Sequence, residues 1–195
     1  MRVWAVHPVW VYERLQREGV LHYDFGLSDY NDLEEFVVAY DWMAEQMRKR
    51  IGEPPAGVKY PFWAWHTLDW KHKKVDLRTL QFRYYDKPSV CLELEIPDNQ
   101  VLLNDEDGWY SVLGDRLSGE ANNESEWEAE QAWFDALPKK EQENAKRKSW
   151  EKIFDVTPFK NDWNWRGRDI QATFWELRLD QVVDARYFCW PTVKR

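Results

Sequence analysis

Residues 2–23, RVWAVHPVWVYERLQREGVLHY, predict how the fold begins. Residues 2–6 alternate and are rich in apolar side chains, which is typical of a short strand. His7 occupies the place of a helix N-cap, Pro8 the first helical position, and Gly19 the position after an amphipathic stretch. We therefore expect a strand, a helix that ends at Gly19, and a second short strand that ends at residue 23.

The middle of the chain predicts a long helix and two strands. Over residues 33–51 apolar side chains recur at steps of three and four, with Asp32 as the N-cap and Gly52 as the end. Residues 62–66 indicate a strand made largely of aromatics, and residues 90–96 alternate as a strand near the centre of a sheet does. The helix side chains that we expect to be buried are Phe36, Val37, Tyr40, Ala44 and Met47.

The remaining elements complete an α+β fold. Residues 105–153 hold turn glycines and two charged helical segments broken at Pro138, so they are a candidate for a helical insertion. Residues 170–177 predict a strand, and residues 184–188 predict another. We expect short split β-sheets with flanking helices, in a single domain of residues 1–195.

Composition excludes several classes of protein. Hydrophobic residues make up 44% and charged residues 32% of the 195 positions, as in a water-soluble globule. The chain has neither an apolar run that could cross a bilayer nor a signal peptide, so we expect a cytoplasmic protein. The net charge of −8 disfavours broad binding to nucleic acid or anionic lipid. Cys91 and Cys189 are far apart without nearby ligand partners, and both are interpreted as small buried hydrophobes.

No motif of high specificity for a cofactor or a reaction is present. The four histidines are dispersed, so the sequence proposes no metal site. The chain has 14 tryptophans, whose flat faces suit a carbohydrate, nucleobase or nicotinamide. The plainer interpretation of these indoles is a compact core.

The chain resembles an uncharacterised family of bacterial and phage proteins known only as a domain of unknown function. The stretches that carry the resemblance are VWAVHPVWVYERLQREGVL (3–21), AYDWMAEQM (39–47), VKYPFWAW (58–65), CLELEIPDNQVLLNDEDGWY (91–110) and IQATFWELRLDQV (170–182). They span nearly the whole chain, and this resemblance implies no activity.

A second resemblance, at the level of the fold, is to the ADP-ribosyltransferase superfamily, which holds NAD between short split sheets. It implies that His7, at the end of the first strand, contacts the bound nucleotide. It also implies that a ring among Tyr60, Trp63 and Trp65 stacks on nicotinamide. The late strand is similar to the one that carries the catalytic glutamate, but here Gln171 stands at that position.

This departure puts catalysis in doubt. A carboxylate steadies the developing oxocarbenium ion, whereas a neutral amide supplies only a hydrogen bond. Glu176 is the other catalytic candidate, but it lies five residues after Gln171, and an odd shift along a strand reverses the face. The resemblance therefore favours binding of NAD or a related nucleotide, with weak or absent transferase activity, and leaves open whether the protein is an enzyme.

Two further patterns have both a functional and a plain interpretation. Glu93 and Glu95 project from one face of a strand and could act as a carboxylate pair or bind a divalent cation. The plain alternative is that they form the wet face of that strand. The basic turn holds Lys71, His72, Lys73 and Lys74, with Trp70 before it and Arg78 beyond. It combines cations with an aromatic ring, as nucleic-acid sites do, or it is a solvated loop.

Two functions thus stay open at the level of sequence. The first is an ADP-ribosyltransferase-like domain that binds NAD or another nucleotide, in a cleft that gathers His7, an aromatic residue and Gln171. The second is a non-enzymatic interaction module, in which the acidic surface and the insertion of residues 105–153 recognise a protein partner, for example in conflict between phage and host.

Overall fold

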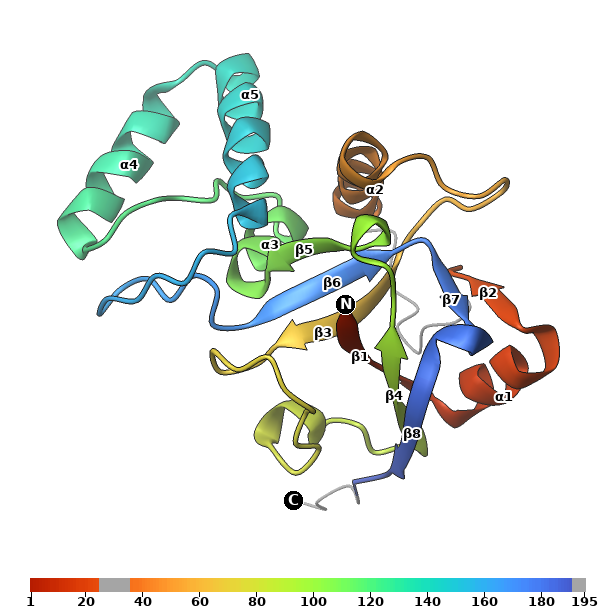
Figure 1. Cartoon of the computed structure of the whole chain (residues 1–195). Coiled ribbons are helices and arrows are strands. Elements are labelled where there is room, and N and C mark those ends of the chain that lie inside the picture. Colours follow the sequence, from red (N-terminus) through yellow and green to blue (C-terminus); the bar gives the residue numbers. More distant parts are fainter. Residues whose placement is uncertain (25–35, 191–195) are drawn as a thin grey trace. The chain divides into compact units, whose positions relative to one another are not determined.

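The computed structural model describes residues 1–24 and 36–190 and contains the following elements (Figure 1). The strands are β1 (Arg2–Pro8), β2 (Val20–His22), β3 (Phe62–Thr67), β4 (Ser89–Glu95), β5 (Leu102–Asp105), β6 (Ile170–Phe174), β7 (Glu176–Arg178) and β8 (Val182–Phe188). The α-helices are α1 (Val9–Glu18), α2 (Val37–Ile51), α3 (Glu106–Leu113), α4 (Glu124–Ala136) and α5 (Lys139–Trp150). The short 3-10 helices are η3 (Leu80–Phe82), η4 (Asp98–Gln100), η5 (Glu151–Phe154) and η6 (Leu179–Gln181).

These elements confirm the expected α+β class. Six strands are hydrogen-bonded in the order β5-β6-β3-β1-β4-β8, and β2 pairs with β7 in a separate two-stranded sheet. The chain divides into two compact units. Unit 1 holds Met1–His66, His72–Leu102 and Ala172–Arg195, and unit 2 holds Thr67–Lys71 and Leu103–Gln171. That residues 1–195 fold as one domain stays a prediction.

Unit 1 is built around β1 and β4, which pair antiparallel along their whole length. Val3 and Ala5 of β1 are fully buried, as are Leu92 and Leu94 of β4. The N–H of Gly19 donates to the carbonyl of Leu15 at 2.8 Å, and Gly19 has a φ of 78°. Only glycine adopts this conformation readily, so α1 ends at Gly19 as the sequence predicts.

The core of unit 2 is formed by α3, α5 and η5. Trp150 is fully buried, and its indole N–H donates to the carbonyl of Arg116 at 2.7 Å. Ile153 packs against Gly108, where a Cβ would lie only 2.8 Å from its Cγ2 atom. Trp150 and Ile153 are thus the large apolar side chains of this part of the core. The predicted insertion corresponds to the three helices between β5 and β6.

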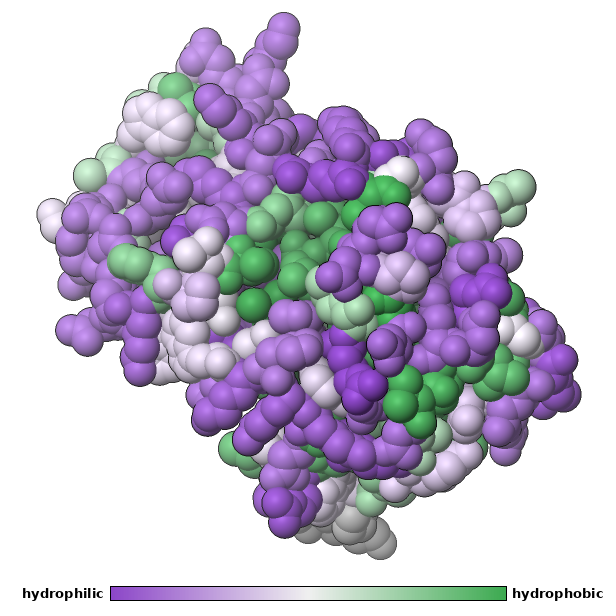
Figure 2. Space-filling view, in the orientation of Figure 1, coloured by the Kyte–Doolittle hydropathy of each residue, from purple (hydrophilic) through white to green (hydrophobic). Residues whose placement is uncertain are grey.

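Helix α4 differs from the other long helices because none of its residues is buried. Asn123 caps its start by accepting the N–H of Glu126 at 3.0 Å, and the helix ends before Pro138. Its large apolar side chains include Trp127, which is 48% exposed. Figure 1 shows α4 and α5 as a helical hairpin, and Figure 2 shows a mostly hydrophilic surface over them. Glutamates at every second position of residues 124–130 distribute charge around α4, so most of its surface is hydrated.

Several local expectations are wrong. Pro8, not His7, is the N-cap of α1, because β1 continues through both residues. The late strand is interrupted at Trp175, whose indole N–H donates to Gly52 O at 3.1 Å, so its second half pairs with β2 instead. Cys189 is exposed, whereas Cys91 is buried as expected.

The buried face of α2 is turned from the one we expected. Of the five side chains expected to be buried, Ala44 and Met47 are buried. The other three, Phe36, Val37 and Tyr40, are only half-buried. The buried residues of this helix are Ala39, Trp42, Met43, Ala44, Gln46 and Met47. The expected N-cap, Asp32, lies outside the described residues.

Candidate functional site

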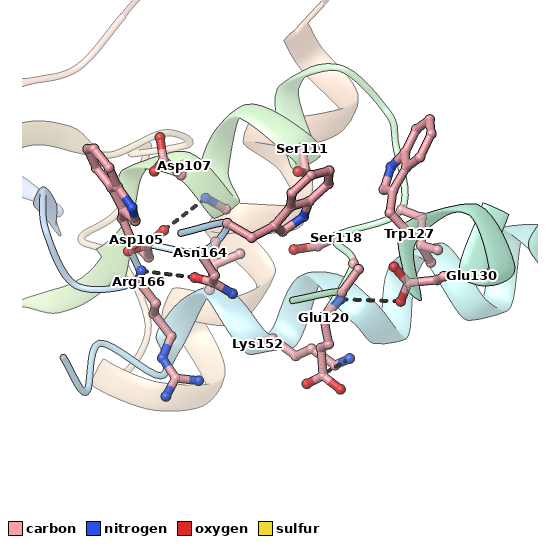
Figure 3. Close-up of a pocket in the computed structure, with 17 residues that line it drawn as sticks. Asp105, Asp107, Ser111, Ser118, Glu120, Trp127, Glu130, Lys152, Asn164 and Arg166 are labelled. Carbon is pink, nitrogen blue, oxygen red and sulfur yellow. Dashed lines mark hydrogen bonds and ion pairs between the residues drawn. The ribbon is translucent and has the colours of Figure 1, made fainter. Parts of the chain in front are cut away.

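A cavity of about 350 Å³ lies within unit 2 and is the candidate site (Figure 3). Its walls come from α3, from residues 117–121, from α4, and from residues 163–166. Three tryptophans line it, together with four carboxylates, two cations, and the polar side chains of Ser111, Ser118 and Asn164. The cavity therefore combines flat apolar faces with acidic and neutral hydrogen-bonding groups.

The three tryptophans of the wall are Trp127, Trp163 and Trp165, each between 42% and 48% exposed. The guanidinium of Arg168 lies 4.9 Å from the ring centroid of Trp165, and the ammonium of Lys160 lies 5.5 Å from it. Within the described part of the chain, no cation or aromatic ring stacks on Trp127 or Trp163. These two rings are open to a ligand.

Both cations in the wall are already neutralised by other parts of unit 2. The ammonium of Lys152 lies 3.0 Å from the carboxylate of Glu120. The guanidinium of Arg166 lies 2.8 Å from the carboxylate of Asp155 and donates to the carbonyl of Thr157 at 3.0 Å. A ligand consequently meets few uncompensated positive charges in this cavity.

The carboxylates of the wall are compensated less completely. Asp105 is buried and accepts backbone N–H groups from Gly108 at 3.0 Å and Gly167 at 2.6 Å. Burial raises the pKa of Asp105, and these two hydrogen bonds oppose the rise. Glu130 accepts the N–H of Glu120 at 3.2 Å through Oε1, while its buried Oε2 has no hydrogen-bond partner among the described residues.

Glu106 lies between two lining residues at the start of α3 but does not itself line the cavity. Burial raises the pKa of Glu106 to about 7, and the negative charges of Asp169 and Asp107 add to the rise. The hydroxyl of Tyr110 donates to Glu106 at 3.4 Å and weakly opposes it. The first turn of α3, which supplies Asp107 to the cavity wall, therefore carries a carboxylate whose charge changes near neutral pH.

We expect Glu106→Gln to stabilise the protein at pH 8. The ordinary pKa of this group is 4.5, so between about pH 4.5 and 7 the folded state holds a proton that the unfolded state releases. The free energy of unfolding therefore falls as pH rises through this window. Removing the charge should raise the free energy of unfolding by about 1–2 kcal/mol at pH 8. The gain is modest because solvent reaches part of the side chain and screens the charge.

Urea denaturation at pH 5 and pH 8 measures this effect of Glu106→Gln. Glu128→Gln, an exposed change on α4, is the matched control. A pH dependence of stability that is the same in the parent and in Glu106→Gln would show that Glu106 does not titrate in this window.

Four of the site residues expected from the sequence lie in unit 1. Burial lowers the pKa of His7 to about 4, and its Nε2 atom has no hydrogen-bond partner among the described residues. The hydroxyl of Tyr60 donates to Asp41 at 3.1 Å. Trp63 contacts the ring of Tyr40, with centroids 5.9 Å apart. Trp65 is the register partner of Trp4 across β1 and β3.

The other two expected residues, Gln171 and Glu176, occupy different surroundings. Gln171 belongs to unit 2, where its Oε1 accepts the Nδ2–H of Asn104 at 3.4 Å. Glu176 belongs to unit 1 and lines a second cavity of about 220 Å³, with its Oε1 2.9 Å from His22 Nε2. That His7, an aromatic residue and Gln171 share one cleft stays a prediction.

Of the two carboxylates on β4, only Glu95 faces water. Glu93 is buried, and its carboxylate lies 3.0 Å from the guanidinium of Arg2 and 3.8 Å from the ammonium of Lys74. Glu95 is exposed, and it lies 3.1 Å from the same arginine. Glu93 is buried because β4 is covered on both faces, which alternation alone does not reveal.

In the basic turn most of the cations are neutralised by ion pairs. Lys71 lies 2.7 Å from Asp69, and Arg78 lies 2.8 Å from Asp76. The ammonium of Lys74 also lies 2.6 Å from Asp184. The turn therefore presents little net positive charge for nucleic acid.

Sequence reasoning missed the carboxylates and two of the tryptophans that form the unit 2 cavity. The signal that could have found them is the stretch NDWNWRGRD, residues 161–169, which mixes turn formers with two tryptophans. Asp107 and Glu130 carried no such signal, because each lies in a charged helix and joins the cavity only through the fold.

Comparisons with known proteins give one match. A family model described as "Domain of unknown function (DUF3841)" matches residues 2–183. No curated protein and no solved structure matches the chain. None of the helices described in residues 1–24 and 36–190 has the length and apolar character of a membrane span. In the same residues, no group of three or more His, Cys, Asp or Glu side chains could hold a metal ion.

Proposed function

Because the chain belongs to the DUF3841 family, whose description assigns no activity, we propose a function from the candidate site: unit 2 is an interaction module for a basic segment of another protein. The observation that carries this proposal is the composition of α4. The helix has five carboxylates, no lysine or arginine, and no buried residue. Its tryptophans, Trp127 and Trp133, are 48% and 52% exposed.

Within unit 2, the α4 carboxylates of Glu126 and Glu130 accept hydrogen bonds from the segment before the helix. None of its carboxylates forms an ion pair within the described residues. Exposed aromatics surrounded by charge are a feature of protein-binding surfaces, where tryptophan is enriched among residues that dominate affinity. The negative charge complements a lysine- or arginine-rich partner and repels an acidic one.

The cavity supports the same ligand class. Lys152 and Arg166 are paired within unit 2, so the lining has excess negative charge. A dinucleotide diphosphate would bring two further negative charges to this surface, at a cost in free energy. A basic polypeptide would instead neutralise the surface while its apolar groups cover the indoles.

Fluorescence anisotropy with labelled synthetic peptides tests the proposal. Peptides of equal length that are basic, neutral or acidic should bind in that order, and binding of the basic peptide should weaken as salt increases. The double variant Glu128→Gln and Asp135→Asn should weaken binding of the basic peptide by about 3- to 30-fold, since each exposed charge contributes about 0.3–1 kcal/mol.

A matched double variant, Glu13→Gln and Glu45→Gln, makes the same change in net charge within unit 1 and should leave affinity unchanged. Equal binding of the three peptides, or no binding of the basic one, contradicts the proposal. If both double variants weaken binding of the basic peptide equally, net charge alone explains the affinity, and this result also contradicts the proposal.

A second candidate is an ADP-ribosyltransferase-like function that binds NAD or a related nucleotide in the cytoplasm. One observation favours it: the imidazole of His7 is neutral at pH 7 and its buried Nε2 has no partner among the described residues. A bound nucleotide would raise the melting temperature by mass action, so a thermal-shift comparison of NAD and ADP-ribose is the test.

In this second candidate Gln171 supplies one neutral hydrogen bond to the ligand. Gln171→Ala should then weaken binding by about 0.5–1.5 kcal/mol, and Gln171→Glu should release nicotinamide from NAD because a negative charge would face the oxocarbenium-like transition state. Absence of any shift with either ligand contradicts the candidate. Equal affinity of the parent and Gln171→Ala contradicts the role of Gln171.

A further inference from the structure

The unit 2 cavity has the features of a pocket for one cationic side chain. Its volume of about 350 Å³ is that of a small-ligand site. Trp127 and Trp163 present indole faces that no cation of the described residues occupies. Among aromatic side chains, an indole is the most favourable ring for a cation.

The neighbouring indole already binds cations from the chain itself. Arg168 and Lys160 lie 4.9 and 5.5 Å from the ring centroid of Trp165. The same short loop therefore contains one tryptophan with its cations in place and one, Trp163, that lacks them. Trp165 thus shows, within the same loop, the cation contact that Trp163 is able to make with a ligand.

A buried hydrogen-bond acceptor supplies an independent argument. The Oε2 atom of Glu130 is shielded from solvent without a donor in the described part of the chain, while Oε1 accepts the N–H of Glu120. Figure 3 shows Glu130 beside Trp127 in the cavity wall. Oε2 is covered in this structure, next to Gly119, so a guanidinium reaches it only after the Glu130 side chain turns toward the cavity. The N–H groups of the ligand would then form charge-assisted hydrogen bonds with a carboxylate oxygen that has no donor of its own.

We propose that this cavity binds the guanidinium of an arginine side chain from the partner, held by Trp127, Trp163 and the Glu130 carboxylate. Arginine fits better than lysine because its planar group stacks on indoles, carries five donors, and is more weakly hydrated than an ammonium. Asp107, which forms no ion pair among the described residues, adds negative charge at the other side of the cavity. This inference rests on the proposed function, since it assigns one anchor residue of the basic segment.

The experiment uses N-acetyl-arginine methylamide as the probe, with the lysine and citrulline analogues for comparison. Citrulline has nearly the shape of arginine but no charge. Titrations of the full chain are followed by the indole N–H signals in NMR spectra, which Trp127→Leu and Trp163→Leu assign. The arginine probe should shift the signals of both residues and bind at least fivefold more tightly than citrulline.

We expect Glu130→Gln and Trp163→Leu each to weaken binding of the arginine probe by fivefold or more. The control is Trp10→Leu, which replaces an exposed tryptophan of unit 1 and should leave the affinity unchanged. Circular dichroism and thermal melting check that each variant is folded. A second substitution, Gly119→Ala, gives an independent route, because the new Cβ would collide with Glu130 Oε2 and displace that carboxylate. Gly119→Ala should therefore also weaken binding of the arginine probe.

The outcomes separate this inference from the proposed function. Binding of citrulline or lysine as tightly as arginine overturns the assignment, as does an affinity that the cavity variants leave unchanged. If basic peptides bind the parent and Trp163→Leu equally, the interaction surface stands and the arginine pocket is wrong. If the arginine probe binds but no basic peptide does, the pocket stands as a guanidinium site and the proposed function fails.

Discussion

Trp150→Ala is expected to lower the free energy of unfolding by about 3–5 kcal/mol, the usual cost of truncating a buried tryptophan. The indole is fully buried, and its N–H donates to the carbonyl of Arg116 at 2.7 Å. Truncation would leave a cavity in the core of unit 2 and a carbonyl without its donor. Urea denaturation followed by circular dichroism measures the loss.

Two matched variants separate burial from the loss of an aromatic residue as such. Trp133→Ala removes an indole of α4 that is 52% exposed, and it should cost less than about 1 kcal/mol. Trp150→Phe keeps most of the packing and should cost about half as much as Trp150→Ala. A loss below about 1 kcal/mol for Trp150→Ala contradicts the assignment of this residue to the core of unit 2.

Asp105→Ala is expected to cost about 2–4 kcal/mol. One carboxylate accepts the N–H of Gly108 at the start of α3 and the N–H of Gly167 in the loop of residues 161–169. Without it, two backbone donors at a buried position lose their acceptor, at about 1–3 kcal/mol each before relaxation. The helix also loses its N-cap.

Asp105→Asn distinguishes the acceptor role from the charge. An asparagine oxygen can accept one of the two N–H groups, but its NH₂ group then faces the other donor, so this variant should recover at most half of the loss. Hydrogen exchange of the Gly108 and Gly167 amides measures the local effect. Unchanged protection of both amides in Asp105→Ala would contradict the role of this carboxylate.

The sequence predicted the elements that have a strong local signal. The strand, helix and glycine end of residues 2–19 were found because periodicity and capping act within a few residues. Residues 90–96 were recognised as a strand for the same reason, but β4 is second from the edge of its sheet and not near the centre. Even there, the burial of Glu93 was missed, because the cover over its face comes from distant parts of the chain.

The errors have a common physical cause in long-range contacts. The late strand breaks at Trp175 because its indole N–H bonds the carbonyl of Gly52, a residue 123 positions away. The buried face of α2 centres on Met43 because neighbouring rings hold Tyr40 at the margin of the core. Neither partner is visible in a local window of sequence.

The candidate site was the least predictable part. Its lining comes from α3, α4, η5 and a loop that lies more than 50 residues after the first lining residue. No single spacing in the sequence therefore encodes the site. The sequence did identify the insertion of residues 105–153 as a candidate for recognising a protein. It could not identify Glu130, because an unpaired carboxylate oxygen is a property of the fold and not of the residue.

The hydrogen bond between Asn104 and Gln171 has a consequence for how such a chain can change over generations. It joins side chains 67 positions apart at the start and end of the longer segment of unit 2, with donor and acceptor 3.4 Å apart. A segment whose ends meet can be lengthened, shortened or replaced without rerouting the strands outside it. We therefore expect members of the family to share the sheet and to differ most in length and sequence between these two positions. The inserted helices could then be exchanged during evolution and acquire a binding specificity of their own.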